Sequence, residues 1–125
     1  MKITSLVLWV QDATLSYKFY KKLGFTVTSV TERDAAVSCG MFEVMLVTMR
    51  DEAEFNSDSL ASEKGKGMYI YVSVDNVDVK YGELKKFGLE LKAEPRDWPW
   101  GNREFVVSDP DGYKLCFWQK SKALQ

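Results

Sequence analysis

The sequence predicts an α+β protein made of two tandem βαβββ modules, which together form a curled mixed sheet, a cup, with the helices on its outside. Two observations predict this class: an internal repeat, and the same alternation of strand-like and helix-like segments in both halves. A chain of 125 residues with 46% hydrophobic content also fits one compact domain. We therefore expect a single domain over residues 1–125, with module one at 1–50, a linker at 51–65 and module two at 66–125.

The internal repeat aligns residues 6–12 with residues 70–76, and residues 17–25 with residues 81–89. In the second pair of segments a tyrosine, a Lys-Lys dipeptide and a glycine recur at the same places. The first strand of each half, expected at residues 3–10 and 67–74, is rich in alternating β-branched and aromatic residues. Each half therefore begins with a half-buried strand.

A helix is expected directly after each first strand. Asp12 and Asn76 can cap the free amide groups of the first turn, and Gly24 and Gly88 can adopt the left-handed conformation that ends a helix. Apolar residues at three- or four-residue spacing predict the buried stripes, which are Leu15, Phe19 and Leu23 in the first helix and Val77, Tyr81 and Leu84 in the second.

Three short strands are expected after each helix. In the first half they lie at 25–31, 35–39 and 42–49, and in the second half at 90–93, 103–108 and 114–119. Residues 50–65 between the halves are polar and contain few large apolar side chains, as is typical of a linker.

Composition excludes several classes of function. Seventeen basic and eighteen acidic residues give a net charge of −1, so there is no basic footprint for nucleic acid or anionic membranes. The apolar stretch near the N-terminus is too short for a signal peptide or a membrane span, and we expect a soluble, cytoplasmic protein. Cys39 and Cys116 are too few for a disulfide scaffold, and the absence of histidine removes the commonest transition-metal ligand and general base.

The paired βαβββ pattern, the opening VQDATLSYKFYKKLGF and the ending GNREFVVSDPDGYKLCFW resemble the vicinal oxygen chelate superfamily. This superfamily includes glyoxalases, extradiol dioxygenases, fosfomycin-modifying enzymes and bleomycin resistance proteins. The resemblance covers nearly the whole chain. Pro99-Trp100-Gly101, just before Arg103, looks most like the metal-free bleomycin resistance branch.

The resemblance also implies where a metal would be bound. The positions that hold ligands in the metal-dependent members fall on Ser5, Met45, Tyr69 and Cys116, and a shift of two residues along one strand would replace Met45 by Glu43. A hydroxyl, a thioether, a phenol and a thiol are not the nitrogen and oxygen set that Zn²⁺, Mn²⁺ or Fe²⁺ sites use. We therefore expect no metal and no cofactor.

Aromatic side chains with polar tips replace the ligands on the expected inner face of the cup. Strand alternation places Val7 and Trp9 with Ser5, Tyr71 with Tyr69, and Trp118 with Cys116. Such a surface can stack on flat ring systems. The predicted ligand-binding residues are Ser5, Val7, Trp9, Met45, Tyr69, Tyr71, Trp98, Trp100, Arg103, Cys116 and Trp118.

Each of these residues also has a structural interpretation. Trp9 and Tyr69 would equally well plug an empty cup, and Trp98 and Trp100 would anchor their loop or seal a subunit contact. Cys116 is expected to be an inert buried thiol rather than a nucleophile. The default partner of Arg103 is solvent or a salt bridge, and Glu104 is expected on the opposite strand face, exposed to solvent.

Two functions of different classes follow from this pattern. The first is a metal-free binding protein that sequesters a planar, partly aromatic small molecule, as the bleomycin resistance resemblance implies. The second is a metal-independent lyase or isomerase that uses Glu43, a tyrosine or Cys116 as acid or base. The resemblance also implies a homodimer, with a binding site shared between subunits.

Overall fold

A computed structural model describes residues 1–49 and 59–122. The chain divides into two compact units. Unit 1 contains residues 1–64 together with Asp109–Asp111, and unit 2 contains Gly65–Ser108 and Gly112–Gln125. Most of the predicted linker, residues 51–65, lies outside the described residues.

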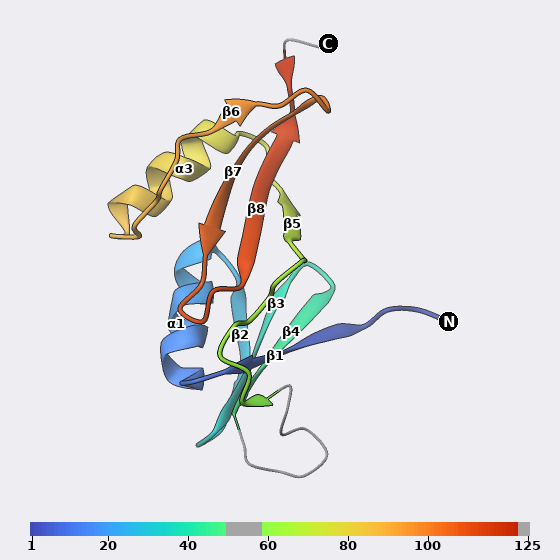
Figure 1. Cartoon of the computed structure of the whole chain (residues 1–125), viewed down its shortest axis with the longest axis vertical. Helices are drawn as coiled ribbons and strands as arrows, with labels where there is room; N and C mark the ends of the chain where they lie inside the picture. Colours follow the sequence, from blue (N-terminus) through green and yellow to red (C-terminus); the bar gives the residue numbers. More distant parts are fainter. Residues whose placement is uncertain (50–58, 123–125) are drawn as a thin grey trace. The chain divides into compact units, whose positions relative to one another are not determined.

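Unit 1 is a four-stranded mixed sheet with one helix (Figure 1). Its strands lie in the order β1-β4-β3-β2, with β1 parallel to β4 and the other neighbours antiparallel. The helix packs against β2, β3 and β4. The elements are β1 (Ser5–Val10), α1 (Ala13–Leu23), β2 (Thr26–Val30), β3 (Asp34–Cys39) and β4 (Phe42–Thr48).

Unit 2 repeats this topology. Its sheet has the order β5-β8-β7-β6, again with the first pair parallel, and the helix packs against β7 and β8. The elements are β5 (Ile70–Ser73), α3 (Val77–Lys86), β6 (Arg96–Asp97), β7 (Asn102–Ser108) and β8 (Lys114–Lys120). The predicted α+β class and the two βαβββ modules are confirmed.

The core of each unit lies between the sheet and its helix. In unit 1 the central helix-facing side chains of β1, β3 and β4 are buried, and in unit 2 the same holds for the inner residues of β7, β8 and α3. Burial of these apolar side chains is the main contribution to stability. They are Leu8, Val10, Val37, Val44 and Leu46 in unit 1, and Val77, Leu84, Phe105, Val107, Leu115 and Phe117 in unit 2.

The predicted helix caps are confirmed, and in the predicted stripe of the first helix Leu23 is buried as expected, whereas Leu15 is not. Asp12 accepts hydrogen bonds from the amides of Thr14 and Leu15, and Gly24 ends α1 with a φ of 111°. Leu15 itself is 56% exposed. The buried face of α1 is instead rotated to Ala13, Ser16, Tyr20 and Leu23, because this face carries the small side chains that allow close packing and the tyrosine that reaches a buried acid.

The Asp-Pro-Asp turn after β7 belongs to unit 1 by its contacts. The hydroxyl of Tyr20 donates to buried Asp109 at 2.8 Å. Asp111 accepts from the Gln11 amide at 2.9 Å and from the Ser16 hydroxyl at 3.4 Å. Asp111 therefore holds the start of α1, where negative charge is favourable, and Asp109 holds the helix further along, at Tyr20.

One predicted strand is misplaced. Residues 90–93 form no strand, and β7 is instead paired with the two-residue β6, where Arg96 pairs with Glu104 and Asp97 with Arg103. Pro95 has no amide hydrogen for a ladder, so regular pairing begins only after it. Immediately beyond β6, the amide of Trp98 donates to the Asn102 carbonyl at 2.8 Å and fixes the loop between them.

Candidate functional site

The face of the second sheet that points away from α3 carries two rows of paired side chains. Strand register places Tyr71, Cys116 and Val106 side by side in one row. The next row runs from Ser73 through Trp118 to Glu104 and Arg96. We call this surface the aromatic face. Tyr71 is 52% exposed, so the face is open to solvent in unit 2.

Glu104 is the polar centre of the aromatic face. Its side chain is only 5% exposed. One carboxylate oxygen, Oε1, accepts from the Tyr71 hydroxyl at 3.2 Å and from the Trp100 indole at 3.1 Å, and Oε2 accepts from the Asn102 amide at 3.3 Å. The expectation that Glu104 is exposed is wrong. Its three donors come from β5, from the tryptophan loop and from β7, so this one carboxylate fixes several side chains at once.

The two tryptophans of the loop are stacked. The ring centroids of Trp98 and Trp100 are 4.7 Å apart and their planes differ by 14°. The guanidinium of Arg96 lies 3.3 Å from the centroid of Trp98. Two flat groups cannot cover the same side of one ring at these distances. Trp98 is therefore sandwiched between Arg96 and Trp100, while Trp100 is 58% exposed.

The phenol and thiol of the first row hold their protons at neutral pH. Loss of water around its hydroxyl, with the negative charges of Cys116 and Glu104, raises the pKa of Tyr71 to about 12. Burial, followed by the charge of Glu104, raises the pKa of Cys116 to about 12. Tyr71 and Cys116 are therefore hydrogen-bond donors here, and neither serves as a nucleophile or base near neutral pH.

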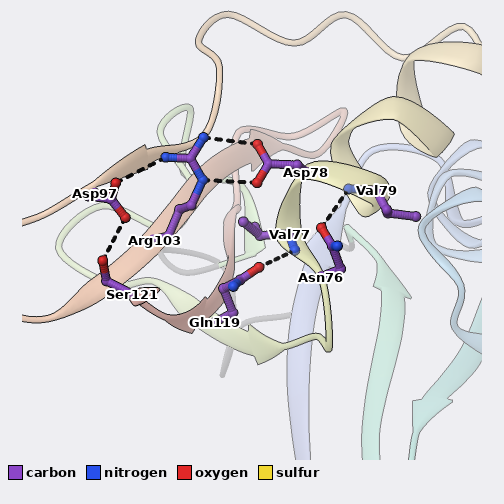
Figure 2. Close-up of polar contacts among 8 residues, drawn as sticks. All are labelled: Asn76, Val77, Asp78, Val79, Asp97, Arg103, Gln119 and Ser121. Carbon is purple, nitrogen blue, oxygen red and sulfur yellow. Dashed lines mark hydrogen bonds and ion pairs between the residues drawn. The ribbon is translucent and has the colours of Figure 1, made fainter. Parts of the chain in front are cut away.

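Arg103 lies on the opposite face of the same strand. Its register partner is Gln119, and alternation along β7 turns it towards α3, away from Glu104. Its guanidinium donates to both carboxylate oxygens of Asp78 at 2.9 Å and to Asp97 at 3.3 Å (Figure 2). The hydrogen bonds with Asp78 and the attraction between the charges lower the pKa of that carboxyl.

Further hydrogen bonds on the α3 side of this sheet hold neighbouring elements of unit 2 together. Figure 2 shows Ser121 donating to Asp97, at 2.7 Å, and the Gln119 side chain accepting from the Val77 amide, at 2.6 Å. The first bond joins β6 to the residue that follows β8, and the second joins the start of α3 to β8. The predicted site residue Arg103 is thus separated from Tyr71, Trp100, Cys116 and Trp118 by the thickness of the sheet.

The remaining predicted residues divide between the two units. In unit 1, Val7 pairs with Met45 and Ser5 with Glu43, so that Ser5, Val7, Trp9, Glu43 and Met45 share the face of that sheet opposite α1. Val7 is 48% and Met45 38% exposed. In unit 2, Tyr69 is exposed and lies 5.6 Å from the ammonium of Lys114.

Sequence reasoning missed Glu104, Asn102 and Arg96. The signal for Glu104 was present in the strand pattern, because counting by two from Cys116 and Trp118 across a hairpin gives Val106 and Glu104 as their partners. Arg96 could not be found in this way, since the strand that carries it was expected at 90–93.

The four positions that correspond to metal ligands do not fit a metal ion. A hydroxyl, a thioether, a phenol and a thiol include no imidazole and no carboxylate. In unit 1, Ser5 pairs with Glu43 and Val7 with Met45, so Glu43 adds a single carboxylate to this face. In the part of the chain that the structure describes, no group of three or more histidine, cysteine or acidic residues could hold a metal. No catalytic step through a metal follows from this donor set.

Comparison with protein families matches residues 2–117 to the Glyoxalase/Bleomycin resistance protein/Dioxygenase superfamily. The chain belongs to this superfamily. A bleomycin resistance protein of Geobacillus stearothermophilus is 29% identical over 124 residues, which cover 91% of this chain and 93% of the relative. A protein of the same name from Staphylococcus aureus matches equally well.

Several solved structures share the fold. A glyoxalase/bleomycin resistance protein/dioxygenase from Nocardioides superposes with a TM-score of 0.80 at 24% identity, covering 98% of this chain and 85% of that one. A hypothetical protein of S. aureus has a TM-score of 0.76 at 25% identity, covering 94% and 93% of the two chains. Among the helices of the described residues, none is long and apolar enough to cross a membrane.

Proposed function

We propose that this protein binds a planar, partly aromatic small molecule on the aromatic face of unit 2 and sequesters it without a metal or cofactor. The observation that carries the proposal is the ring of Trp100. It is 58% exposed, is backed by Trp98 and is fixed at its nitrogen by buried Glu104. A large ring held in one orientation loses little entropy on binding, which suits stacking.

The relatives named bleomycin resistance proteins support this function over an enzymatic one. The raised pKa values of Tyr71 and Cys116 keep both groups protonated, which argues against either of them as the base of a metal-independent lyase or isomerase. A sequestering protein needs no proton transfer. It needs only a preformed surface and releases the ligand chemically unchanged.

Titration of the intrinsic fluorescence tests the proposal. Suitable ligands are bleomycin, bithiazole fragments and quinones, and three of the four tryptophans lie in unit 2. Replacing Trp100 by alanine should weaken binding about five- to hundredfold, equivalent to roughly 1–3 kcal/mol of lost stacking. The matched control is Phe87→Ala, which removes another exposed ring of unit 2 and should leave affinity unchanged.

Two results would contradict the proposal. One is a folded protein whose fluorescence none of these compounds changes. The other is a Trp100→Ala variant that binds as tightly as Phe87→Ala. Recovery of a chemically altered ligand after incubation would instead indicate turnover and support the lyase or isomerase.

We further propose that the protein is a cytoplasmic homodimer in which a second copy contributes to the ligand site. Each sheet, taken by itself, leaves one face with exposed large apolar residues, Val7 and Met45 in unit 1 and Tyr71 and Val106 in unit 2. Monomers normally cover surfaces of this kind. Sedimentation equilibrium should give twice the chain mass of 14.3 kDa. A folded monomer at micromolar concentration contradicts a shared site.

A further inference from the structure

Trp98 and Trp100 leave one ring face for a ligand. The guanidinium of Arg96 covers one side of Trp98, at 3.3 Å, and Trp100 covers the other. One side of Trp100 is therefore taken by Trp98, and the outer side remains. The indole nitrogen of Trp100 is already bonded to Glu104. A ligand at this ring is thus recognised through its flat surface and not through a hydrogen bond to the indole.

The carboxylate of Glu104 is hydrogen-bonded to uncharged groups. Its bonded partners are a phenol, an indole and a carboxamide, and no cation of the described residues forms an ion pair with it. Arg96 is its register neighbour, but its guanidinium lies over Trp98. A negative charge that is only 5% exposed and has no ion-pair partner keeps a strong local field.

This charge lies at the edge of the ring on which the ligand stacks. The Oε1 atom of Glu104 is 3.1 Å from the indole nitrogen of Trp100, whereas Arg96 is separated from Trp100 by the thickness of Trp98. Lys114 lies over Tyr69, and Lys120 is at the exposed end of β8, where water screens it. Among the charged groups of the described residues, Glu104 is therefore the one bonded directly to the Trp100 ring.

We infer that the outer face of Trp100 is a stacking site for flat cationic rings, and that Glu104 is the residue that selects them over neutral rings of the same shape. The inference rests on the proposed function and narrows its ligand class. An aromatic ring face attracts cations through its quadrupole, and a carboxylate that accepts the indole N–H adds to the negative potential of that face. Arg96 on Trp98 is an example of the same stacking within the chain.

A pair of probes with one shape and different charge tests the inference. N-methylacridinium is a permanent flat cation, and acridine is its uncharged counterpart at mildly alkaline pH. An opposite charge within several ångströms in a partly buried site should favour the cation by about five- to twentyfold in affinity. Both dissociation constants are measured by tryptophan fluorescence and by calorimetry.

The decisive variant is Glu104→Gln. Glutamine keeps a carbonyl oxygen for Tyr71 and Trp100, and its amide can meet the Asn102 side chain after that group turns over. The ring should stay in place while the charge is lost. Affinity for acridine should change less than about twofold, and the preference for N-methylacridinium should fall to near one. The matched control, Glu83→Gln on α3, removes an exposed charge of the same unit and should keep the preference.

The outcomes separate the inference from the proposed function. If both probes bind equally and Trp100→Ala abolishes both, the proposed function stands and the cation selectivity is wrong. If neither probe nor any compound of the panel binds, the proposed function fails as well. A preference that survives in folded Glu104→Gln overturns the role of Glu104. If that variant does not fold, the wild-type preference should decline towards one as salt is raised, and a salt-independent preference overturns the inference.

Discussion

The two sheets carry the same pair of residues, an arginine followed by an acid, at corresponding positions, and use the acids differently. Asp34 begins β3 and pairs with Val47, which pairs with Trp9. Its carboxylate accepts from the Thr48 amide at 3.2 Å. Its backbone amide and carbonyl bond to Thr31 across the β2–β3 turn. In unit 1 the acid therefore serves the backbone of its own sheet.

Glu104 occupies the matching position in unit 2, where it pairs with Trp118, which in turn pairs with Ser73. Its carboxylate accepts from three side chains instead of the backbone. The longer glutamate reaches the tryptophan loop, for which unit 1 has no counterpart in its short β2–β3 connection. The comparison teaches that the two halves share a scaffold, and that the acid beside the longer connection bonds side chains of a surface loop.

The largest expected difference between the two sheets is the effect of their cysteines on how stability depends on pH. Cys39 in β3 is exposed and Cys116 in β8 is buried. The folded protein raises the pKa of Cys116 from 9.0 to about 12, so it keeps a proton that the unfolded chain loses. Stability is therefore complete below about pH 9 and falls as pH rises towards 12, by roughly 2–4 kcal/mol from this group.

Urea unfolding at several pH values between 8 and 11 gives the free energy of unfolding as a function of pH, and the slope of that curve tests the difference. Cys116→Ala should flatten the alkaline decline, leaving the smaller contribution of Tyr71 in the same direction. Cys39→Ala should keep the full decline. Equal slopes in the two variants would show that the environments of the thiols do not differ as described. Alkylation of the native protein at neutral pH should modify Cys39 alone.

The sequence predicts the scaffold well because repeat, alternation and caps are local signals. Both helices, their capping residues and seven of the expected strands need only the pattern of near neighbours to be found. The strand expected at 90–93 fails because Leu89 and Leu91 alternate as a strand would, while Pro95 delays pairing. Leu15 fails because apolarity alone does not show which side of α1 faces the sheet.

The site is less predictable because it depends on which face of a strand each side chain occupies. Arg103 and Glu104 are neighbours on β7 and therefore lie on opposite faces, so a shift of one residue between β7 and β8 would exchange them. The sequence did not show that Glu104 is the buried one, and a role of Arg103 in ligand binding stays a prediction. The stack of Arg96 on Trp98 depends on a loop geometry that no periodicity encodes. Trp100 was found because its motif resembles a known branch, and its role in binding stays a prediction.

Two tyrosines that donate to acids should differ in their effect on stability. Tyr20 is fully buried and donates to Asp109 at 2.8 Å in unit 1, whereas Tyr71 is half exposed and donates to Glu104 at 3.2 Å in unit 2. Tyr20→Phe should lower the free energy of unfolding by about 1–2 kcal/mol, because a buried carboxylate loses a donor that water does not readily replace. Tyr71→Phe should lower it by less than about 1 kcal/mol, because the bond that is lost is longer and the Tyr71 side chain is half exposed.

Thermal unfolding of both phenylalanine variants, with probe titrations beside it, measures this difference. Tyr71→Phe should weaken the binding of planar cations and leave the midpoint temperature nearly unchanged. Tyr20→Phe should lower the midpoint temperature and leave that affinity nearly unchanged. A larger loss of stability in Tyr71→Phe than in Tyr20→Phe would mean that the Tyr71–Glu104 bond stabilises the fold of unit 2. The proposed difference between the two tyrosines would then be wrong.

The smallest expected effect concerns the arginines that precede the two acids. Arg103 forms a two-pronged pair with Asp78, but the two side chains are 29% and 55% exposed, so solvent screens most of the attraction. Arg103→Lys loses the planar fork and should lower stability by about 0.3–1 kcal/mol. Arg33→Lys, at the exposed matching position of unit 1, should change it by less than about 0.5 kcal/mol.

Because Arg103 lies on the opposite face of the sheet from Glu104, ligand affinity should stay within about twofold of wild type in Arg103→Lys. A tenfold loss of affinity with unchanged stability would place Arg103 in the binding site and contradict the separation of the two faces.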